Sequence, residues 1–510
     1  MQSGEFAKFW NKNKRSLVIV IIMLTIAYGM KMFHLAISHD TEAIISVADS
    51  LYWSWLSMGR FGLIAIKYLF DLEVFNPYLA AIFTFLMLIA NAILWEYLFF
   101  KLTTFKKRFF AVSWIFPALF LTAPIMADQI SFLLQAFEVQ FAILLVGIAL
   151  LLLWPRREKK HHFYKYIFAC ALLAVSFSCY QSTVPLFVAG AVACFLLAFP
   201  VIKKKWCVIV KLIICFLIAF LAYGIINRVV MEYMDVTPTS YISDQILWGT
   251  ISARECINNI VTHIFDVLKG NGIFYSCAYL VSAIMLLGII IAKIIKKQKQ
   301  IVLFILVSIL LLITPFLMTI LMGQAPTTRV QIVLPFVFGF IIQYFFMHWE
   351  KVIPLKKHIV PKINAIVSVF VLILCLEQCI WDARIYYTEY VVYEEDVRLA
   401  VKISDRIERL GLGESPNEPV VFIGSREPTL NKSAYAHISM SGYSFFEISF
   451  STAHGTWVMK NFMATLGYNY LYPSGEQVAQ AEEYAKSMEC WPNSNSVAVH
   501  NGIIIVKLSE

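Results

Sequence analysis

The residues best suited to chemistry gather between Leu35 and Arg60, directly after the first apolar segment. His39, Asp40 and Glu42 lie within four residues of one another, and an aromatic run follows them. A carboxylate in such a stretch can act as a general base that takes a proton from a hydroxyl group. Residues at i and i+2 do not face each other on a helix, so Asp40 and Glu42 are not an obvious pair. One of them alone is the candidate base.

These residues also have ordinary structural explanations. Asp40 or Thr41 would cap a helix that begins at Glu42, since helix starts favour such side chains. His39 could tune the neighbouring Asp40, although a lone histidine in a loop is usually solvated. The two alternatives for Asp40, base and helix cap, stay open on the sequence.

Arg60 and Arg329 are the candidates for recognising a phosphate group. A guanidinium fork matches phosphate oxygens. Arg329 follows two threonines and directly precedes an apolar segment, which would place its side chain at headgroup depth. The alternative for both arginines is an interfacial anchor to lipid headgroups.

Asp128 and Gln129 lie in a short polar turn, predicted at Ala127–Ser131, between two apolar segments. Gln135 and Glu138 follow one helical turn apart, so they should face the protein interior. The alternative for this group is a polar contact between helices. A divalent metal would need several oxygen ligands from separate loops, which the sequence cannot show, and the argument does not require one.

The composition is that of a polytopic helical membrane protein. The chain has 510 residues, of which 60% are hydrophobic and only 15% are charged, against about a quarter charged in soluble domains. Its apolar runs have the length that crosses a hydrocarbon core of about 30 Å. The net charge of +9 comes from short basic clusters between these runs. Such clusters set orientation in a bilayer, so we expect no nucleic-acid partner.

Eleven spans are expected, with the N-terminus cytoplasmic and the C-terminus outside. One face then receives 25 Lys and Arg residues and the other receives 7, a bias typical of membrane proteins. The second half of the opening loop, Gly59–Phe70, is predicted to be a helix lying at the membrane surface. The expected spans cover about residues 17–37, 77–100, 109–126, 132–154, 166–179, 183–200, 208–226, 273–292, 302–322, 332–347 and 363–381.

The chain divides by composition into residues 1–381, mainly α and spanning the membrane, and residues 382–510, a small extracytoplasmic α/β domain. Helices are predicted at Tyr390–Leu410, Met459–Leu466 and Gly475–Met488. Pro419–Gly424 is predicted as a strand. Ser496–Leu508 is predicted as a hairpin, because two β-rich runs flank Asn501-Gly502.

Several classes of function lack their motifs. The sequence has no Walker loop, no dinucleotide-binding glycine pattern after a strand and no HExxH pair, which argues against an ATP-driven pump and a zinc protease. Its ten cysteines are scattered, mostly in apolar segments, with no zinc spacing. No inverted halves with broken helices are evident, which makes a secondary transporter less attractive.

Three motifs carry a resemblance to a known family. These are SHDTEAI with WSWLSMGRFGLIAIKYLF after the first span, DQISFLLQAFEVQFAILLVGIALLLL, and FSCYQSTVPLFVAG. The chain resembles the bacterial Gtr type II glucosyltransferases, which are polytopic enzymes associated with glucosylation of O-antigen and other surface polysaccharides. The C-terminal stretches PVVFIG and SVAVHNGIIIVKL resemble the tail of many members.

The resemblance implies a GT-C-like glycosyltransferase of the bacterial cytoplasmic membrane. Such an enzyme takes glucose or a related hexose from undecaprenyl phosphate and transfers it to a glycan acceptor on the outer face, with inversion. Asp40 falls at the position of the catalytic base, with Glu42 as the second choice. The alternative is a transporter or flippase of a glycan or lipid-linked sugar. The substrate-binding residues expected from the motifs and loops are Arg60, Asp128, Gln129, Tyr180, Gln181 and Arg329.

Overall fold

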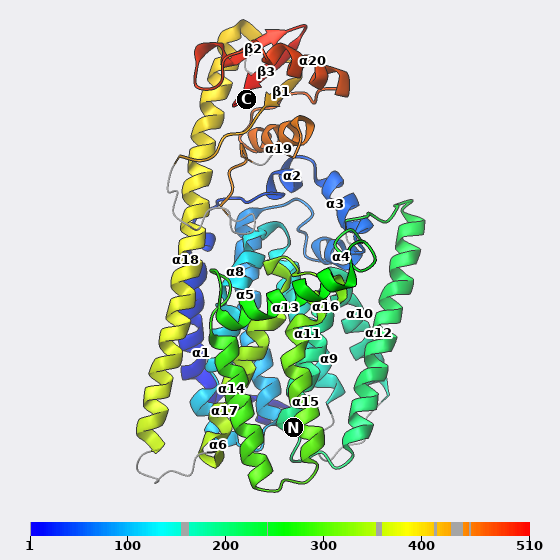
Figure 1. Ribbon diagram of the computed structural model, residues 1–510, viewed down its shortest axis with the longest axis vertical. Coiled ribbons are helices and arrows are strands. Elements are labelled where there is room, and N and C mark those ends of the chain that lie inside the picture. The colour runs from blue at the N-terminus through cyan, green and yellow to red at the C-terminus, as the bar shows by residue number, and fades with distance from the viewer. Residues whose placement is uncertain are drawn as a thin grey trace.

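A computed structural model of the chain shows a long bundle of helices with a small domain at one end (Figure 1). The described residues are 2–154, 163–241, 243–352, 360–412, 416–429, 442–447 and 450–510. Parts of the predicted basic loops, residues 155–162 and 353–359, lie outside these ranges. So do residues 413–415, 430–441 and 448–449 of the C-terminal region.

Within the described ranges, six helices are long and apolar enough to cross a membrane. They coincide with the first, second, fourth, seventh, eighth and ninth predicted spans. Three shorter apolar helices fall on the fifth, sixth and tenth. The total of eleven remains a prediction. The six span segments are Gly4–Phe33 of α1 (Gln2–Phe33), α5 (Pro77–Leu102), α9 (Leu133–Leu153), α12 (Lys205–Tyr233), α14 (Ala278–Ile295) and Ile301–Met322; the shorter ones are α10 (Tyr164–Cys179), α11 (Thr183–Ala198) and Val333–Trp349 of α17 (Val333–Val352).

The third predicted span is broken rather than continuous. Its two parts, Arg108–Leu121 and Pro124–Ser131, meet at an angle of 47°. Pro124 stands at the start of the second part, where a proline begins a helix and cannot continue the preceding one. The polar turn predicted at Ala127–Ser131 is therefore wrong, because these residues belong to the short helix α8 (Pro124–Ser131). The first part holds α6 (Lys106–Val112) and α7 (Ile115–Leu121).

The eleventh predicted span and the first helix of the C-terminal region form one helix. This is α18 (Val360–Ile407), 48 residues long, which rises along the whole bundle (Figure 1). No Gly or Pro occurs between residues 363 and 410, so nothing in the backbone chemistry interrupts it. Gly411, with φ of 82°, ends it in the left-handed conformation that glycine tolerates. The change in composition at residue 382 is thus not a break in the chain's structure.

The C-terminal region carries a three-stranded sheet of order β1-β3-β2. β1 (Val420–Ile423) is parallel to β3 (Ile503–Lys507), and β2 (Val497–His500) pairs with β3 as the predicted antiparallel hairpin. Asn501 and Gly502 both have positive φ, as such a turn requires. Helices α19 (Thr452–Thr465) and α20 (Gly475–Ala485) pack against opposite faces of this sheet.

Between the bundle and this domain lies a layer of short helices. The opening loop forms α2 (Thr41–Ser46), α3 (Ala48–Ser57) and α4 (Phe61–Leu69), of which the last is the predicted surface helix. The long loop after α12 adds the amphipathic α13 (Ala253–Lys269), which a Ser252–Glu255 capping box begins. The remaining helices are α15 (Ile301–Ile313), η1 (Thr314–Phe316), α16 (Leu317–Met322), η2 (Thr328–Val330), η3 (Glu408–Leu412) and η4 (Ser494–Ser496).

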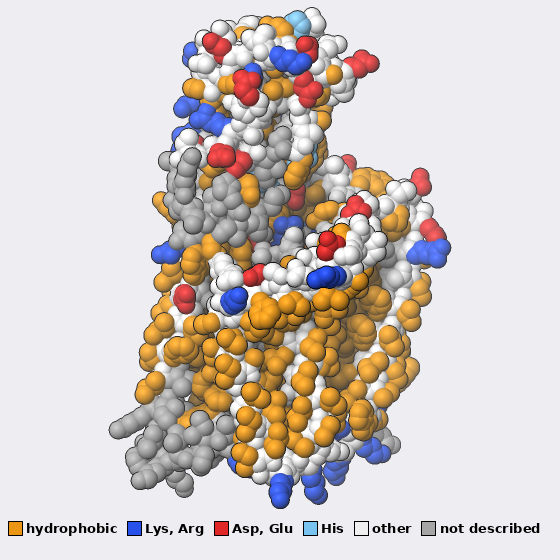
Figure 2. All heavy atoms as spheres, in the orientation of Figure 1, with side chains coloured by type: hydrophobic (Ala, Val, Ile, Leu, Met, Phe, Trp, Pro, Cys, Tyr) orange, Lys and Arg blue, Asp and Glu red, His pale blue; other side chains and the backbone are white. Residues whose placement is uncertain are grey.

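The surface of the bundle is an apolar belt (Figure 2). Basic side chains gather at its lower end, whereas acidic and basic side chains mix at its upper end. Above the belt, the face in view is hollowed between the C-terminal domain and the top of the bundle. The layer of short helices borders this hollow (Figure 1).

Candidate functional site

Asp40 occupies an unusual place in the opening loop. Its φ of 68° lies in the left-handed region, which a non-glycine residue seldom adopts. It stands at the N-cap position of α2, but its side chain makes no capping hydrogen bond. The residue is exposed, whereas Thr41 and Glu42 beside it are buried. The Asp40 side chain therefore does not cap the helix, and its carboxylate is accessible to a ligand.

The surroundings of Asp40 have opposing effects on its protonation. Desolvation by the surrounding protein raises the pKa of this carboxyl, while the positive charges of Arg329 and Arg60 and the nearby His454 lower it. Both arginines selected from the sequence therefore lie within electrostatic reach of the selected carboxylate. A carboxylate with a raised pKa and a cationic partner suits general-base work.

Glu42 differs sharply from Asp40, although only two residues separate them. It is 1% exposed, and its Oε2 has no hydrogen-bond partner among the described residues. Burial, followed by the nearby charge of Asp40, raises its pKa well above the ordinary value. The neutral form of Glu42 is therefore favoured, which leaves Asp40 as the accessible carboxylate of this pair.

Arg60 is held in place by Gln135 of α9 and by the turn between α10 and α11. Its Nε donates to Gln181 Oε1 at 3.2 Å, and its Nη1 lies 3.5 Å from Gln135 Oε1. Its guanidinium also lies 5.3 Å from the centre of the Tyr180 ring. Gln181 is fixed in turn by the hydrogen bond from its Nε2 to the carbonyl of Met58, at 2.9 Å. The predicted Tyr180-Gln181 turn thus orients Arg60.

Arg329 has fewer side-chain contacts than Arg60 among the described residues. It lies in η2, and its guanidinium stands 4.3 Å from the centre of the Phe132 ring. Its side chain makes no hydrogen bond or ion pair to any residue that the structure describes. Its main-chain carbonyl accepts a hydrogen bond from the Tyr180 hydroxyl at 3.4 Å. The backbone is anchored while the guanidinium donors remain open.

The side chains of Asp128 and Gln129 form hydrogen bonds in different parts of the molecule. Asp128 Oδ2 accepts a hydrogen bond from the Thr328 hydroxyl, so it fixes the residue next to Arg329. Gln129 instead accepts from Gln140 Nε2 at 3.3 Å, inside the bundle. Asp128 therefore borders the arginine site as a positioning residue. Gln129 belongs to a polar contact between helices.

The C-terminal domain closes over the opening loop. His39 is buried, its Nε2 donates to the carbonyl of Ser444 at 3.2 Å, and its ring lies 4.8 Å from that of Phe445. Burial lowers the His39 pKa to about 4, so the ring stays neutral. The Ser46 hydroxyl donates to the carbonyl of Asn461 at 3.0 Å, which joins α2 to α19. His39 is thus a contact between the two parts of the molecule.

This closure brings in a residue that sequence reasoning missed. His454, on the first turns of α19, is close enough to Asp40 to influence its charge. Its Nδ1 is buried without a hydrogen-bond partner among the described residues. No local pattern marks this histidine, since its importance arises only from a contact between segments more than 400 residues apart.

A metal site is not evident in the described part of the chain. Those residues contain no group of three or more His, Cys, Asp or Glu side chains that could hold a metal ion. The charged groups around Asp40 are instead arginines, which suit an anionic ligand.

A comparison with known proteins gives the family. The family model described as glucosyl transferase GtrII matches residues 29–347, which include every predicted site residue from Asp40 to Arg329. No curated protein and no solved structure shows significant similarity to the chain. The match covers well over half of the chain and agrees with the motifs around Asp40, Asp128 and Tyr180. The chain therefore belongs to the GtrII glucosyltransferase family.

Proposed function

We propose that this protein transfers glucose from a polyprenyl phosphate to a surface glycan on the outer face of the bacterial cytoplasmic membrane. Family membership supports the glucosyl transfer. The observation that carries the remainder is the grouping of one exposed carboxylate, Asp40, with Arg60 and Arg329. Asp40 and Arg60 directly precede α2 and α4, which lie above the long helices of the bundle (Figure 1). A lipid-linked phosphate has its tail in the bilayer and its sugar in water, so its reactive bond lies at this level.

The proposed reaction is a single displacement at the anomeric carbon. The Asp40 carboxylate takes the proton of the acceptor hydroxyl, whose oxygen forms the new bond to the anomeric carbon. The bond from that carbon to the phosphate oxygen breaks, and polyprenyl phosphate leaves with the electron pair. Attack opposite the leaving group inverts the anomeric centre. The guanidinium groups of Arg60 and Arg329 stabilise the charge on the phosphate.

The two arginines would divide this task unequally. Arg60 is already oriented by Gln181 and Gln135, so it offers a preformed contact. Arg329 has its donors open and can make a bidentate contact with two phosphate oxygens. Glu42, held neutral, would add no negative charge that repels the phosphate.

The orientation rests on the distribution of charge. Basic side chains gather at the lower end of the belt, opposite the hollow (Figure 2), and basic loops face the cytoplasm in membrane proteins. This distribution supports a position outside the cell for Asp40, the layer of short helices and the C-terminal domain. The acceptor glycan would approach through the hollow between that domain and the bundle.

The test is an assay of the purified protein with polyprenyl-phosphate glucose and an acceptor glycan. The proposal expects release of polyprenyl phosphate in step with the appearance of glucose on the acceptor. Movement of the lipid-linked sugar across a vesicle membrane without this release would instead identify a transporter or flippase. Structural analysis of the cell-surface glycan from a deletion strain should show the loss of one glucose branch.

A further inference from the structure

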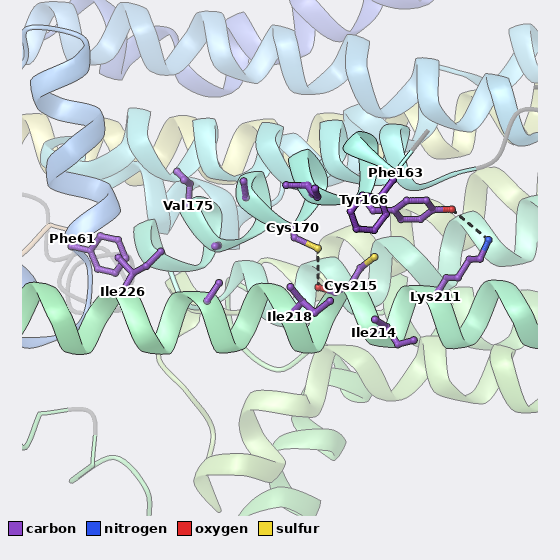
Figure 3. A pocket seen from close by; sticks show the side chains of 14 residues that line it. Phe61, Phe163, Tyr166, Cys170, Val175, Lys211, Ile214, Cys215, Ile218 and Ile226 are labelled. Atoms are coloured by element: carbon purple, nitrogen blue, oxygen red, sulfur yellow. Dashed lines mark hydrogen bonds between the residues drawn. The ribbon is translucent and has the colours of Figure 1, made fainter. Parts of the chain in front are cut away.

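A groove within the apolar belt separates α12 from the rest of the bundle. It lies between α10 and α12, has a volume of about 660 Å³ and is lined almost wholly by apolar side chains (Figure 3). Its walls include Val175 of α10 and Ile214 and Ile218 of α12. Helix α12 has exposed apolar side chains along much of its length, so the groove opens toward the bilayer rather than into the core.

The upper end of this groove adjoins the candidate site. Phe61 lines it, and Phe61 directly follows Arg60 in the chain. The Phe61 ring stacks on Tyr223 of α12 with ring centres 6.1 Å apart. The Tyr223 hydroxyl donates to the carbonyl of Gly59 at 3.3 Å. The stretch that holds Arg60 is therefore fastened to the helix that forms one wall.

The lower end is closed by a polar contact. Lys211 Nζ of α12 lies 3.5 Å from the hydroxyl of Tyr166 of α10 (Figure 3). Fifteen residues of α12 separate Lys211 from Ile226 at the upper end, which corresponds to about 22 Å of helix. The groove thus follows most of a hydrocarbon core of about 30 Å. It runs from the arginine site into the depth of the membrane.

We propose that this groove binds the isoprenoid chain of the donor lipid, with the lipid's phosphate at Arg60. The inference rests on the proposed function and names the binding site of the donor's tail. An extended apolar chain whose polar end meets a guanidinium fits a groove that is apolar along most of its length and whose upper end adjoins Arg60. The Lys211 ammonium at the lower end already has the Tyr166 hydroxyl as its partner. Lateral opening between α10 and α12 lets the lipid enter from the bilayer without leaving it. Because the chain passes from one apolar environment to another, its binding in the groove depends on packing contacts rather than on removal from water.

Obstruction of the groove tests this site. Ala222 lines the groove, so an Ala222→Trp substitution fills part of it. Gly224→Trp is the matched control, because Gly224 lies on the same helix roughly 200° around the axis and a side chain added there meets nothing within 4 Å. We expect Ala222→Trp to raise KM for a long polyprenyl-phosphate glucose by about tenfold, because the indole occupies the space of the isoprenoid chain and removes its packing contacts with the groove. The control should leave KM unchanged.

A donor with a short chain separates a blocked groove from a damaged enzyme. A glucosyl phosphate carrying two isoprene units reaches the arginine site but not the depth of the groove. Ala222→Trp should therefore use this short donor as well as the unsubstituted protein does. Equal KM values for the long donor in Ala222→Trp and Gly224→Trp would overturn the inference while leaving the proposed transfer intact.

Photolabelling provides a measurement that needs neither turnover nor a substitution. A polyprenyl phosphate with a diazirine in its third isoprene unit should label peptides of α10 and α12. Unlabelled polyprenyl phosphate should compete with it, whereas phosphatidylglycerol should not. Equal labelling by a diazirine phosphatidylglycerol, with competition by either lipid, would identify an ordinary membrane lipid in the groove and overturn the inference.

Discussion

Two sets of charged side chains in this molecule have opposite surroundings. Inside the bundle, Lys67 and Glu138 form an ion pair at 2.8 Å, both almost fully buried, and Lys67 Nζ also donates to the carbonyl of Leu134 at 2.6 Å. Around the hollow, Asp40 is exposed and the Arg329 guanidinium makes no hydrogen bond within the described residues.

The difference separates charges that hold the fold from charges that await a ligand. A buried charge without a partner is costly, so an enclosed ionisable group is either paired, as Lys67 and Glu138 are, or favoured in its neutral form, as Glu42 is. The Arg329 donors, which have no partner among the described residues, and the exposed Asp40 carboxylate are the groups that we propose meet the phosphate and the hydroxyl. Substitutions in the first set should alter stability, and substitutions in the second should alter catalysis.

The largest effect is expected for Asp40→Asn. Loss of a general base lowers transfer by about 10²–10⁴-fold, while the amide keeps the size of the side chain. Asp49→Asn is the matched control, because Asp49 is an exposed acid of the same loop. Transfer is measured as glucose incorporated into the acceptor, at equal amounts of folded protein. Full activity of Asp40→Asn would refute the assignment of the base.

Lys67→Met should act on stability. Removal of one partner leaves Glu138 buried and unpaired, which costs about 3–5 kcal/mol, and thermal unfolding in detergent measures it. Removal of both charges by Lys67→Met with Glu138→Leu should recover much of the loss. Arg228→Ala, which breaks an exposed pair with Glu232, should cost less than about 1 kcal/mol. A folded Lys67→Met protein with no activity would break the distinction between the two sets.

Arg329→Gln should lower transfer with little loss of stability. A donor to a developing charge contributes about 10²–10³-fold to the rate. Among the described residues, the Arg329 side chain makes no hydrogen bond or ion pair that the folded protein would lose. Arg60→Gln should lower both the rate of transfer and the stability of the folded protein, since Gln181 and Gln135 would lose their partner. Measurements of kcat and of unfolding temperature on both variants test this contrast. Equal destabilisation by the two substitutions would contradict it.

The smallest effect is expected for His454→Gln. This residue influences Asp40 only through its charge and lies on the C-terminal domain. Interactions across solvent are weak, so transfer should change by about fivefold or less. A loss as large as that of Asp40→Asn would instead assign His454 a direct role in proton transfer.

Much of the fold follows from local patterns in the sequence. Apolar runs identified the six long helices, and Asn501-Gly502 identified the hairpin, because both depend on neighbouring residues. The bend before Pro124 and the continuity of α18 were missed. The first depends on one proline within an apolar run. The continuity of α18 was hidden by the change from apolar to charged composition. Such a change indicates that the helix passes into different surroundings, not that the helix ends.

The site was predictable in its parts but not in its assembly. Topology placed Asp40, Arg60 and Arg329 on one face, and the structure brings them within electrostatic reach. The sequence left Asp40 and Glu42 nearly equivalent, and burial separates them. The contact of His454 with this site required the three-dimensional arrangement of α19 over α2, which no periodicity reveals.

The most direct test of the central claim is the pH dependence of transfer in the unsubstituted protein and in Arg329→Gln. Asp40 must be deprotonated to act, so activity falls as the pH drops through the pKa of its carboxyl. Desolvation by the surrounding protein raises this pKa, and the charge of Arg329 lowers it. Removal of Arg329 takes away a positive charge that favours the carboxylate, so the pKa of Asp40 rises further. We predict that the acidic limb of the profile moves to higher pH in Arg329→Gln. An acidic limb at the same pH in both proteins would contradict the pairing of this base with this arginine.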